Sequence, residues 1–415
     1  MTAAANFTRR RFIARSASTA FALGVMGRRA FGATAFPQLE MPEKIFLRSW
    51  DAGDFSLYLK FKDTHGGARA IRVTATNGAV GYVPHWVSRG SVSGSNPVVW
   101  ATDGGLSDKT VSILRETNLL DHELVHDRLV AAGTAGAELS AADIACWDLH
   151  ARMLGRPLHA LLGTQRIRAL RYGDVRGEAV GFNPQAYADR VAEYLKRNNL
   201  RATKLHFPGA MRTAESIPFD VVKETLRRIR ATVGPEAILA YDPYPRSAES
   251  ATASMAEARE LLALLSELNY AWVEGPLIPE PETTQRAKYA ELMRGVRVRI
   301  QPEGPGEIGD LTDFATIRRW AEAGAADQFS TDCYYRDGLT PLVRLIAWVK
   351  ANPGRNMTLN LHWSWLPHIH LAMACDDAIY PLVELPMSSE IPPALFANSP
   401  FVQAPEWPGI YLRNA

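Results

Sequence analysis

From residue 165 onward, short strand-like segments alternate with longer helix-like segments almost to the end of the chain. The apolar residues of the short segments suit buried strands, and those of the long segments follow the spacing of an amphipathic helix. Such βα repeats over roughly 200–250 residues favour a closed (β/α) barrel. An open doubly wound sheet is the alternative, but no glycine-rich dinucleotide turn follows the first strand. We therefore predict an α/β barrel over residues 165–386, with strands at 170–175, 202–207, 238–241, 271–274, 297–302, 327–332, 357–362 and 381–385.

The chain before residue 160 has a different pattern. Residues 44–90 are rich in strand formers, with an Asn77-Gly78 turn signal between two of the runs. Helical spacing follows, and Ser140 is suited to cap the last of these helices. Strands followed by helices, without alternation, predict a separate α+β domain over residues 43–160. The expected helices are 108–118, 122–132 and 140–154.

The composition excludes only unusual classes of protein. The chain has 415 residues, 47% of them apolar and 22% charged, as in an ordinary soluble protein. A net charge of +2 gives no reason to expect a nucleic-acid partner. The three cysteines are widely spaced and form no CxxC motif, so we expect buried free thiols.

The N-terminal segment is typical of an export signal. Arg9, Arg10, Arg11 and Phe12 precede a weakly apolar run over residues 17–26, and small residues follow. The paired arginines resemble a twin-arginine signal. We therefore predict that residues 1–35 are a signal peptide and that the mature protein is periplasmic. The apolar run is too short to span a membrane, so no stable membrane association is expected after export; a disordered basic tail is the alternative.

Three consecutive barrel strands are each followed by a carboxylate. ILAYDPY contains Asp242, YAWVEGPL contains Glu274 and VRIQPEG contains Glu303. Parallel strands with helical crossovers bring their C-terminal ends to one side of a sheet. Three oxygen donors gathered there suit a hard divalent cation such as Mg²⁺.

Other ionisable residues stand at the remaining strand ends. Lys204 and His206 end the second strand, Asp332 the sixth, His362 the seventh and Glu384 the eighth. Catalytic residues of such barrels lie at the C-terminal ends of the strands. Asp332, at the end of the strand that precedes the strand of His362, suits an acid/base pair with this histidine. We therefore expect an active site at the barrel mouth, the side of the barrel on which the C-terminal ends of the strands lie.

Several motifs resemble the enolase superfamily, in its mandelate racemase-like branch. AADIACWDLHARMLGRPLHALLG, at 141–163, is similar to the first signature of that family. ILAYDPY, AWVEGPL and IQPEG are similar to its metal-ligand strands, and ADQFSTD and LNLHWSW to the strands of its Asp–His pair. The resemblance implies a barrel of the modified TIM type with an N-terminal α+β capping domain. It also implies that residues 387–415 return to the cap.

The resemblance assigns roles to most of the mouth residues. Asp242, Glu274 and Glu303 would hold Mg²⁺, and the substrate carboxylate would bind that cation. His362, oriented by Asp332, would be the general base or acid.

The second strand departs from the family pattern. Relatives often have Lys-x-Lys where this chain has Lys204-Leu205-His206. Alternation keeps Lys204 and His206 on the same face of the strand, so His206 can transfer protons or only hydrogen-bond the substrate. Glu384, if protonated, would donate to the substrate carboxylate; otherwise it is an ordinary barrel-end acid.

The substrate-contacting residues are harder to predict. Tyr244 stands where relatives often have Asn, so the surroundings of the metal differ. In the cap, Tyr82, His85 and Arg89 are candidates to line the pocket, although they can equally pack between the domains.

Three functions fit these expectations. The first is a lyase that dehydrates a sugar acid to a 2-keto-3-deoxy acid, with His362 as base and then acid. The second is a racemase or epimerase of a 2-hydroxy or sugar acid, using His206 and His362. The third is a non-catalytic periplasmic binding protein, against which the complete set of ligand and acid/base residues argues. The resemblance further implies a small carboxylate as substrate and a homo-oligomeric assembly.

Overall fold

The computed structural model describes most of the chain after residue 35. The described residues are 36–53, 55, 70–84, 86–88, 98–101, 105–176, 182–207, 217–243, 254–277, 280–302, 313–334, 337–362, 365–384, 391–396 and 399–411, with the backbone alone for 86–88 and 98–101. The predicted signal segment lies outside them. Across the described residues, none of the helices has the length and apolar character needed to cross a membrane.

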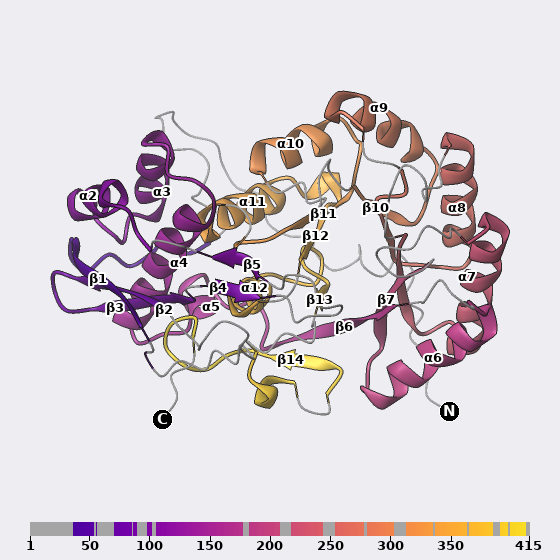
Figure 1. Cartoon of the computed structure of the whole chain (residues 1–415), viewed down its shortest axis with the longest axis horizontal. Helices are drawn as coiled ribbons and strands as arrows, with labels where there is room; N and C mark the ends of the chain where they lie inside the picture. The colour runs from indigo at the N-terminus through magenta and orange to yellow at the C-terminus, as the bar shows by residue number, and fades with distance from the viewer. Residues whose placement is uncertain are drawn as a thin grey trace, which may run out of the picture.

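The N-terminal domain is an antiparallel sheet covered by helices (indigo to purple in Figure 1). Strands β1, β2 and β3 pair in that order, and β4 pairs with β5 as a second small ladder. Residues 98–101, Val-Val-Trp-Ala, therefore form a short strand beyond the predicted strand-rich residues 44–90. The elements are β1 (Leu47–Gly53), β2 (Ala70–Ala75), β3 (Val80–Pro84), β4 (Trp86–Ser88), β5 (Val98–Ala101), α2 (Asp108–Glu116), α3 (His122–Ala131), α4 (Gly136–Met153) and α5 (Leu158–Leu161).

Helix α4 is the central element of this domain. It begins at Gly136, so Ser140 is a buried residue inside the helix and not the expected cap. Gly81 of β3 allows the close approach of sheet and helix, because a Cβ there would lie 2.1 Å from the carbonyl oxygen of Ala145. Asp143 of α4 accepts hydrogen bonds from the backbone N–H groups of Leu339 and Thr340, at 2.6 and 2.9 Å. The carboxylate thus stabilises the N-terminus of a helix that belongs to the second domain.

Strands and helices alternate through the second domain, as the sequence predicts. Its helices lie outside the strands, with α6 to α9 along one rim in Figure 1. The elements are β6 (Arg168–Arg176), α6 (Pro184–Arg197), β7 (Ala202–His206), α7 (Phe219–Val233), β8 (Ile238–Asp242), α8 (Met255–Glu267), β9 (Trp272–Glu274), α9 (Glu282–Leu292), β10 (Arg299–Gln301), α10 (Phe314–Glu322), β11 (Gln328–Thr331), α11 (Leu339–Ala351), β12 (Thr358–Leu361), α12 (Leu366–Met373) and β13 (Leu382–Glu384), with short 3-10 turns η1 (Pro353–Arg355) and η2 (Pro393–Leu395).

The strands of the second domain form a barrel-type parallel sheet. Their order is β10-β9-β8-β7-β6-β13, and β11 pairs with β12. The N–H of Leu359 in β12 donates to the carbonyl oxygen of Ile379, just before β13, at 2.7 Å. This hydrogen bond joins the β11–β12 pair to the end of the longer sheet. The protein therefore has an α+β capping domain followed by an α/β barrel-type domain, which confirms the predicted fold class.

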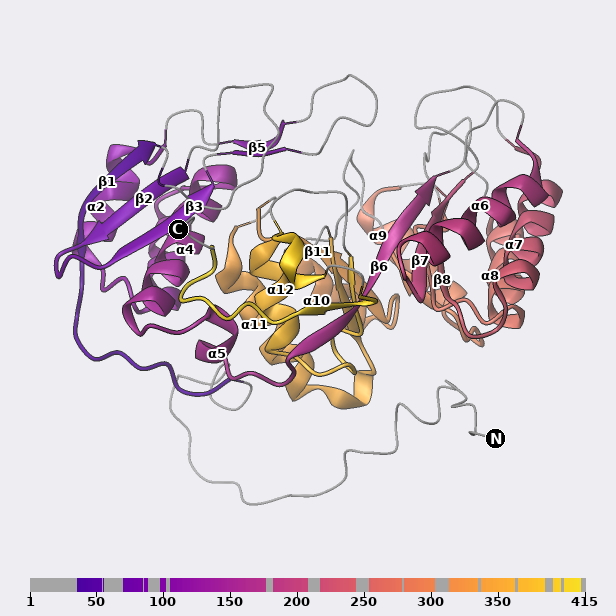
Figure 2. The same cartoon turned by 90° about the horizontal axis from the view of Figure 1, so that it is seen from below.

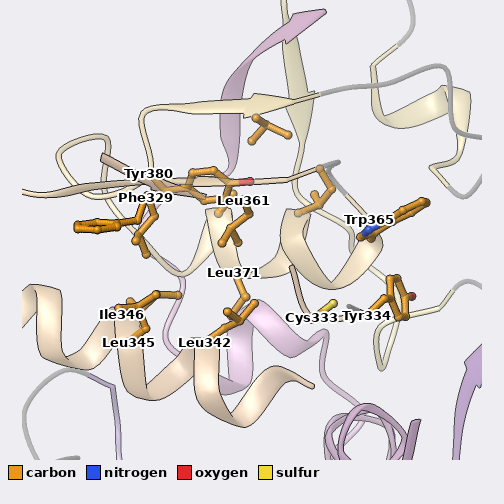
Figure 3. Close-up of a cluster of buried hydrophobic side chains, with 14 of the residues drawn as sticks. Phe329, Cys333, Tyr334, Leu342, Leu345, Ile346, Leu361, Trp365, Leu371 and Tyr380 are labelled. Carbon is orange, nitrogen blue, oxygen red and sulfur yellow. The ribbon is translucent and has the colours of Figure 1, made fainter. Parts of the chain in front are cut away.

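Apolar side chains fill the space between β11, β12 and the helices that cover them. Figure 3 shows Leu342, Leu345 and Ile346 of α11 beneath Phe329 of β11 and Leu361 of β12, all of them buried. The cysteines Cys146, Cys333 and Cys375 are also buried and free, which confirms the expectation from their spacing.

The C-terminal segment runs from the barrel to the cap (yellow in Figure 2). Its strand β14 (Phe401–Gln403) pairs antiparallel with the start of β6. Beyond it, the N–H of Ile410 donates to Asp148 of α4, and Tyr411 donates to or accepts from Tyr334 at 2.7 Å. This segment thus contacts both domains.

Candidate active site

The parallel register brings the expected residues to one end of the barrel. Lys204 and His206 of β7 pair with Ala240 and Asp242 of β8, and Gln301 of β10 pairs with Glu274 of β9. Alternation along each strand turns every second side chain inward. Lys204, His206, Asp242 and Glu274 therefore share the inner face near the C-terminal ends of their strands.

Lys204 lies between two carboxylates. Its Nζ is 3.3 Å from Oε2 of Glu274 and 3.2 Å from Oε1 of Glu384, and all three side chains are at least 95% buried. Burial opposes a charged ammonium, but the two carboxylates outweigh it and hold the pKa of Lys204 well above its usual value. Lys204 is therefore a fixed cation, and Glu384 presents at least one oxygen to it as an acceptor.

His206 also lies between two carboxylates. Its Nδ1 is 3.2 Å from Oδ2 of Asp242, and its Nε2 is 3.4 Å from Oδ2 of Asp174 in β6. Burial lowers the pKa of the imidazole, but Asp242 and Asp174 exceed that effect and raise it to about 9. For Asp174, burial is outweighed by Lys204 and His206, which lower its pKa to about 2.

Asp332 and His362 form the expected pair. Nδ1 of His362 is 3.4 Å from Oδ2 of Asp332, which also accepts the indole N–H of Trp365 at 2.9 Å. The other oxygen of Asp332 accepts the N–H of Tyr334 at 2.7 Å. A proton on Nδ1 lets His362 donate to Asp332 and leaves Nε2 as the basic nitrogen.

The donor set at the mouth fits a divalent cation. Asp242 and Glu274 are 5% and 3% exposed. They are the last residues of the neighbouring parallel strands β8 and β9. Burial, together with the nearby Asp242 and Glu384, raises the pKa of Glu274 to about 7 against the lowering effect of Lys204. Several buried acids with few basic partners would be stabilised by added positive charge, and Asp242 and Glu274 offer the oxygen ligands that Mg²⁺ prefers.

A second group of potential ligands is already committed to the fold. Ligand atoms of Asp332, Cys333 and His368 lie within 4.8 Å of one another. However, Nε2 of His368 accepts the backbone N–H of Cys333 at 3.1 Å, and both oxygens of Asp332 accept the bonds described above. These contacts serve the orientation of Asp332 and do not indicate a metal centre.

Not every predicted residue is described. Glu303, Tyr244, His85 and Arg89 lie outside the described residues. Tyr82 is 3% exposed, and its N–H donates to Asp148 within the cap. Its role in substrate binding stays a prediction.

Three mouth residues have no counterpart in the sequence prediction. Asp174 lies one residue before the end of the predicted first strand, 170–175, and including the ionisable residue nearest that strand end would have found it. Trp272 lies two residues before Glu274, on the same face of β9, and donates its indole N–H to Oε1 of Glu274 at 2.8 Å. Trp365 stands beyond the end of β12, and no strand periodicity could place it beside Asp332.

Comparison with known proteins shows which family the chain is related to. A family model described as "Enolase C-terminal domain-like" matches residues 186–410. The hydrophobic dipeptide epimerase of Roseobacter litoralis is 33% identical over 150 residues, which are 36% of this chain and 38% of that protein. A protein of Caldivirga maquilingensis named "Putative L-rhamnonate dehydratase" is 24% identical over 297 residues, 69% of this chain and 64% of that protein. The chain thus spans less than two thirds of the length of either relative.

Solved structures share the whole fold at low identity. D-glucarate dehydratase from Agrobacterium tumefaciens, complexed with magnesium, has a TM-score of 0.64 and 18% identity, over 89% of this chain and 96% of that one. A racemase from Streptomyces coelicolor with bound magnesium has a TM-score of 0.62 and 18% identity, over 88% and 97%. The family model covers more than half of the chain, and the chain belongs to the enolase superfamily, in its mandelate racemase/muconate lactonizing family.

Proposed function

We propose that this protein is a Mg²⁺-dependent hydro-lyase that converts a sugar acid to a 2-keto-3-deoxy acid. The observation that carries the proposal is the joint presence, at one barrel mouth, of buried metal-type carboxylates and the Asp332–His362 pair. Asp242, Glu274 and Glu303 would hold the cation. When bound, Mg²⁺ supplies positive charge that stabilises the negative charge developing on the substrate carboxylate.

The residues of this chain provide the proton transfers. Nε2 of His362 takes the proton from the carbon next to the carboxylate, and Asp332 stabilises the imidazolium that results. The protonated His362 then returns this proton to the β-hydroxyl, so the Cβ–O bond breaks and water leaves. The enol that remains becomes the 2-keto-3-deoxy acid by tautomerisation.

Lys204 and His206 would contact the negatively charged substrate. The Lys204 ammonium is fixed between Glu274 and Glu384 and would attract the substrate carboxylate. His206 lies 3.2 Å from Asp242 and 3.4 Å from Asp174, and those two carboxylates favour a protonated imidazole that would hydrogen-bond the substrate.

A racemase or epimerase is the second candidate. The observation in its favour is that His206 ends β7 and His362 directly follows β12, and a partial relative is named an epimerase. This reaction requires one of the two histidines to deliver a proton to the face from which the other does not remove it.

Incubation of a panel of sugar acids in D₂O with Mg²⁺ tests the proposal. We expect a keto-acid product for at least one acid, loss of turnover on chelation and recovery when Mg²⁺ returns. Deuterium at the α-carbon with inversion, and no keto-acid, would replace the lyase by the racemase. Absence of both exchange and product across the panel, with ligand binding intact, would favour a binding protein.

A further inference from the structure

We propose that Trp272 is a positioning residue for the metal, because its indole N–H fixes the orientation of the Glu274 carboxylate. This inference rests on the proposed function only in taking Glu274 as a metal ligand. The contact is direct, since Nε1 of Trp272 lies 2.8 Å from Oε1 of Glu274. Oε2 faces Lys204 at 3.3 Å, so each oxygen of the oriented carboxylate has one donor from the protein and a second lone pair for a cation.

The geometry follows from the strand. Trp272 and Glu274 are two residues apart in β9, so both side chains lie on the inner face and the indole is next to the carboxylate. Trp272 is 3% exposed, which excludes water as a ready substitute donor. Hydrogen bonds to an ionised acceptor in such surroundings are the stronger kind.

Small neighbours make room for the indole. Ala240 of β8 pairs with Trp272 on one side and with Lys204 on the other. Its methyl group lets the indole and the lysine approach Glu274 from two directions. Ala202 belongs to the same buried cluster.

The ring is also held from its far side. Tyr172 of β6 contacts it edge to face, with centroids 5.3 Å apart and planes at 73°. The Tyr172 hydroxyl donates to Oδ1 of Asn360 at 2.9 Å, and Asn360 donates to Gln301 at 3.2 Å. The hydrogen-bonded residues Tyr172, Asn360 and Gln301 therefore hold the indole of Trp272 in place, and the indole in turn orients Glu274.

Outer groups that orient metal ligands typically contribute a factor of about 10–100 in metal affinity. The test is the dissociation constant of Mn²⁺, followed by the electron paramagnetic resonance signal of the free ion, in the full chain and in Trp272→Phe. We expect the variant to bind Mn²⁺ about 10–100-fold more weakly. Phenylalanine keeps an aromatic ring against Tyr172 and removes the donor.

Trp320 of α10 provides a matched control. It is 0% exposed, contacts Tyr289 edge to face at 5.3 Å and 70°, and its indole nitrogen has no hydrogen-bond partner among the described residues. Trp320→Phe makes the same change in volume without touching a carboxylate. We expect its Mn²⁺ affinity to stay within about twofold of the parent, on the same reasoning.

The remaining outcomes are also decisive. Parental Mn²⁺ affinity in folded Trp272→Phe, or equal weakening in both variants, would overturn the positioning role. If Trp272→Phe does not fold by circular dichroism, Trp272→Met, which adapts better to an irregular space, carries the same expectation. A parent that binds no Mn²⁺ would instead overturn the metal site of the proposed function.

Discussion

At the scale of residues, the mouth is built from charges that determine one another's state. Lys204 stays charged although it is buried, because Glu274 and Glu384 face it. Asp332 is fully buried, but it receives hydrogen bonds from Trp365 and Tyr334 and faces His362. Each of these carboxylates faces a donor or a positive charge of the protein itself, so its direction is set before a substrate binds.

This arrangement predicts a large effect of Asp332→Asn. The amide still fills the site but carries no charge to stabilise an imidazolium, and its NH₂ group favours the wrong tautomer of His362. We expect α-proton exchange to slow by roughly 10²–10⁴-fold, the usual contribution of such a group. Proton NMR of a turned-over acid in D₂O measures this rate.

The control for that variant is Asp189→Asn, on the surface of α6. Asp189 is exposed and, among the residues that the structure describes, accepts a bond from Gln185 alone. Its exchange rate should match the parent. If Asp332→Asn also keeps the parental rate, His362 is not oriented through Asp332 and the assigned pair is wrong.

At the scale of elements, the contact of α3 with α4 contains two buried histidines. Nε2 of His122 lies 2.9 Å from Nδ1 of His150, whose Nε2 is 2.7 Å from the carbonyl oxygen of Glu40. The His122 ring stacks on Trp147 with centroids 3.6 Å apart. Burial and the neighbouring His150 lower the pKa of His122 well below its usual value, and burial lowers that of His150 against the bond to Glu40.

These shifts predict acid sensitivity of the cap. Above about pH 6.5 both states of the protein hold these imidazoles neutral, and their contribution is fully present. As the pH falls below that value, the unfolded chain binds protons that the folded chain does not, and stability is lost at up to about 1.4 kcal/mol per pH unit for each histidine. In His122→Phe, which keeps a ring on Trp147, we expect urea unfolding to show a smaller loss between pH 6.5 and 5.5. Above pH 7.5 the pH dependence of parent and variant should coincide; an unchanged slope at low pH would show that His122 titrates normally in the fold.

Sequence patterns predicted the positions of the strands and helices better than the contacts between them. The alternation of strand and helix located β6 to β13, because short segments with buried apolar residues alternate regularly with longer helical segments. The predicted start of α4 was wrong: Ser140 is a good cap by residue type, but the helix begins one turn earlier, at Gly136, and Ser140 lies on its buried part, which starts at Leu139. Side-chain partners depend on contacts across the fold, and no local pattern joins Asp143 to Thr340, 197 residues away.

At the scale of the molecule, a few buried carboxylates connect the cap, the barrel and the C-terminal segment. Asp148 accepts the N–H of Tyr82 from the sheet of the cap at 2.8 Å and pairs with Arg152 at 2.6 Å. It also accepts the N–H of Ile410, and Arg152 donates to the carbonyl oxygen of Tyr411. Helix α4 therefore holds the parts of the molecule together, while the barrel strands carry the candidate active-site residues.

Cation binding should be visible in the stability of the whole molecule. The carboxylates of Asp242 and Glu274 come together only when β8 and β9 pair, so the unfolded chain offers no comparable site. A ligand that binds only the folded state stabilises it by RT ln(1 + [L]/Kd), about 2.7 kcal/mol at a hundredfold excess over Kd. We expect Mg²⁺ to raise the midpoint of thermal unfolding of chelator-treated protein by several degrees. The Glu274→Gln variant should lose most of that rise, because its amide keeps the shape but not the charge. A midpoint that does not respond to Mg²⁺ in the parent, or that rises equally in Glu274→Gln, would place the cation elsewhere than at the barrel mouth.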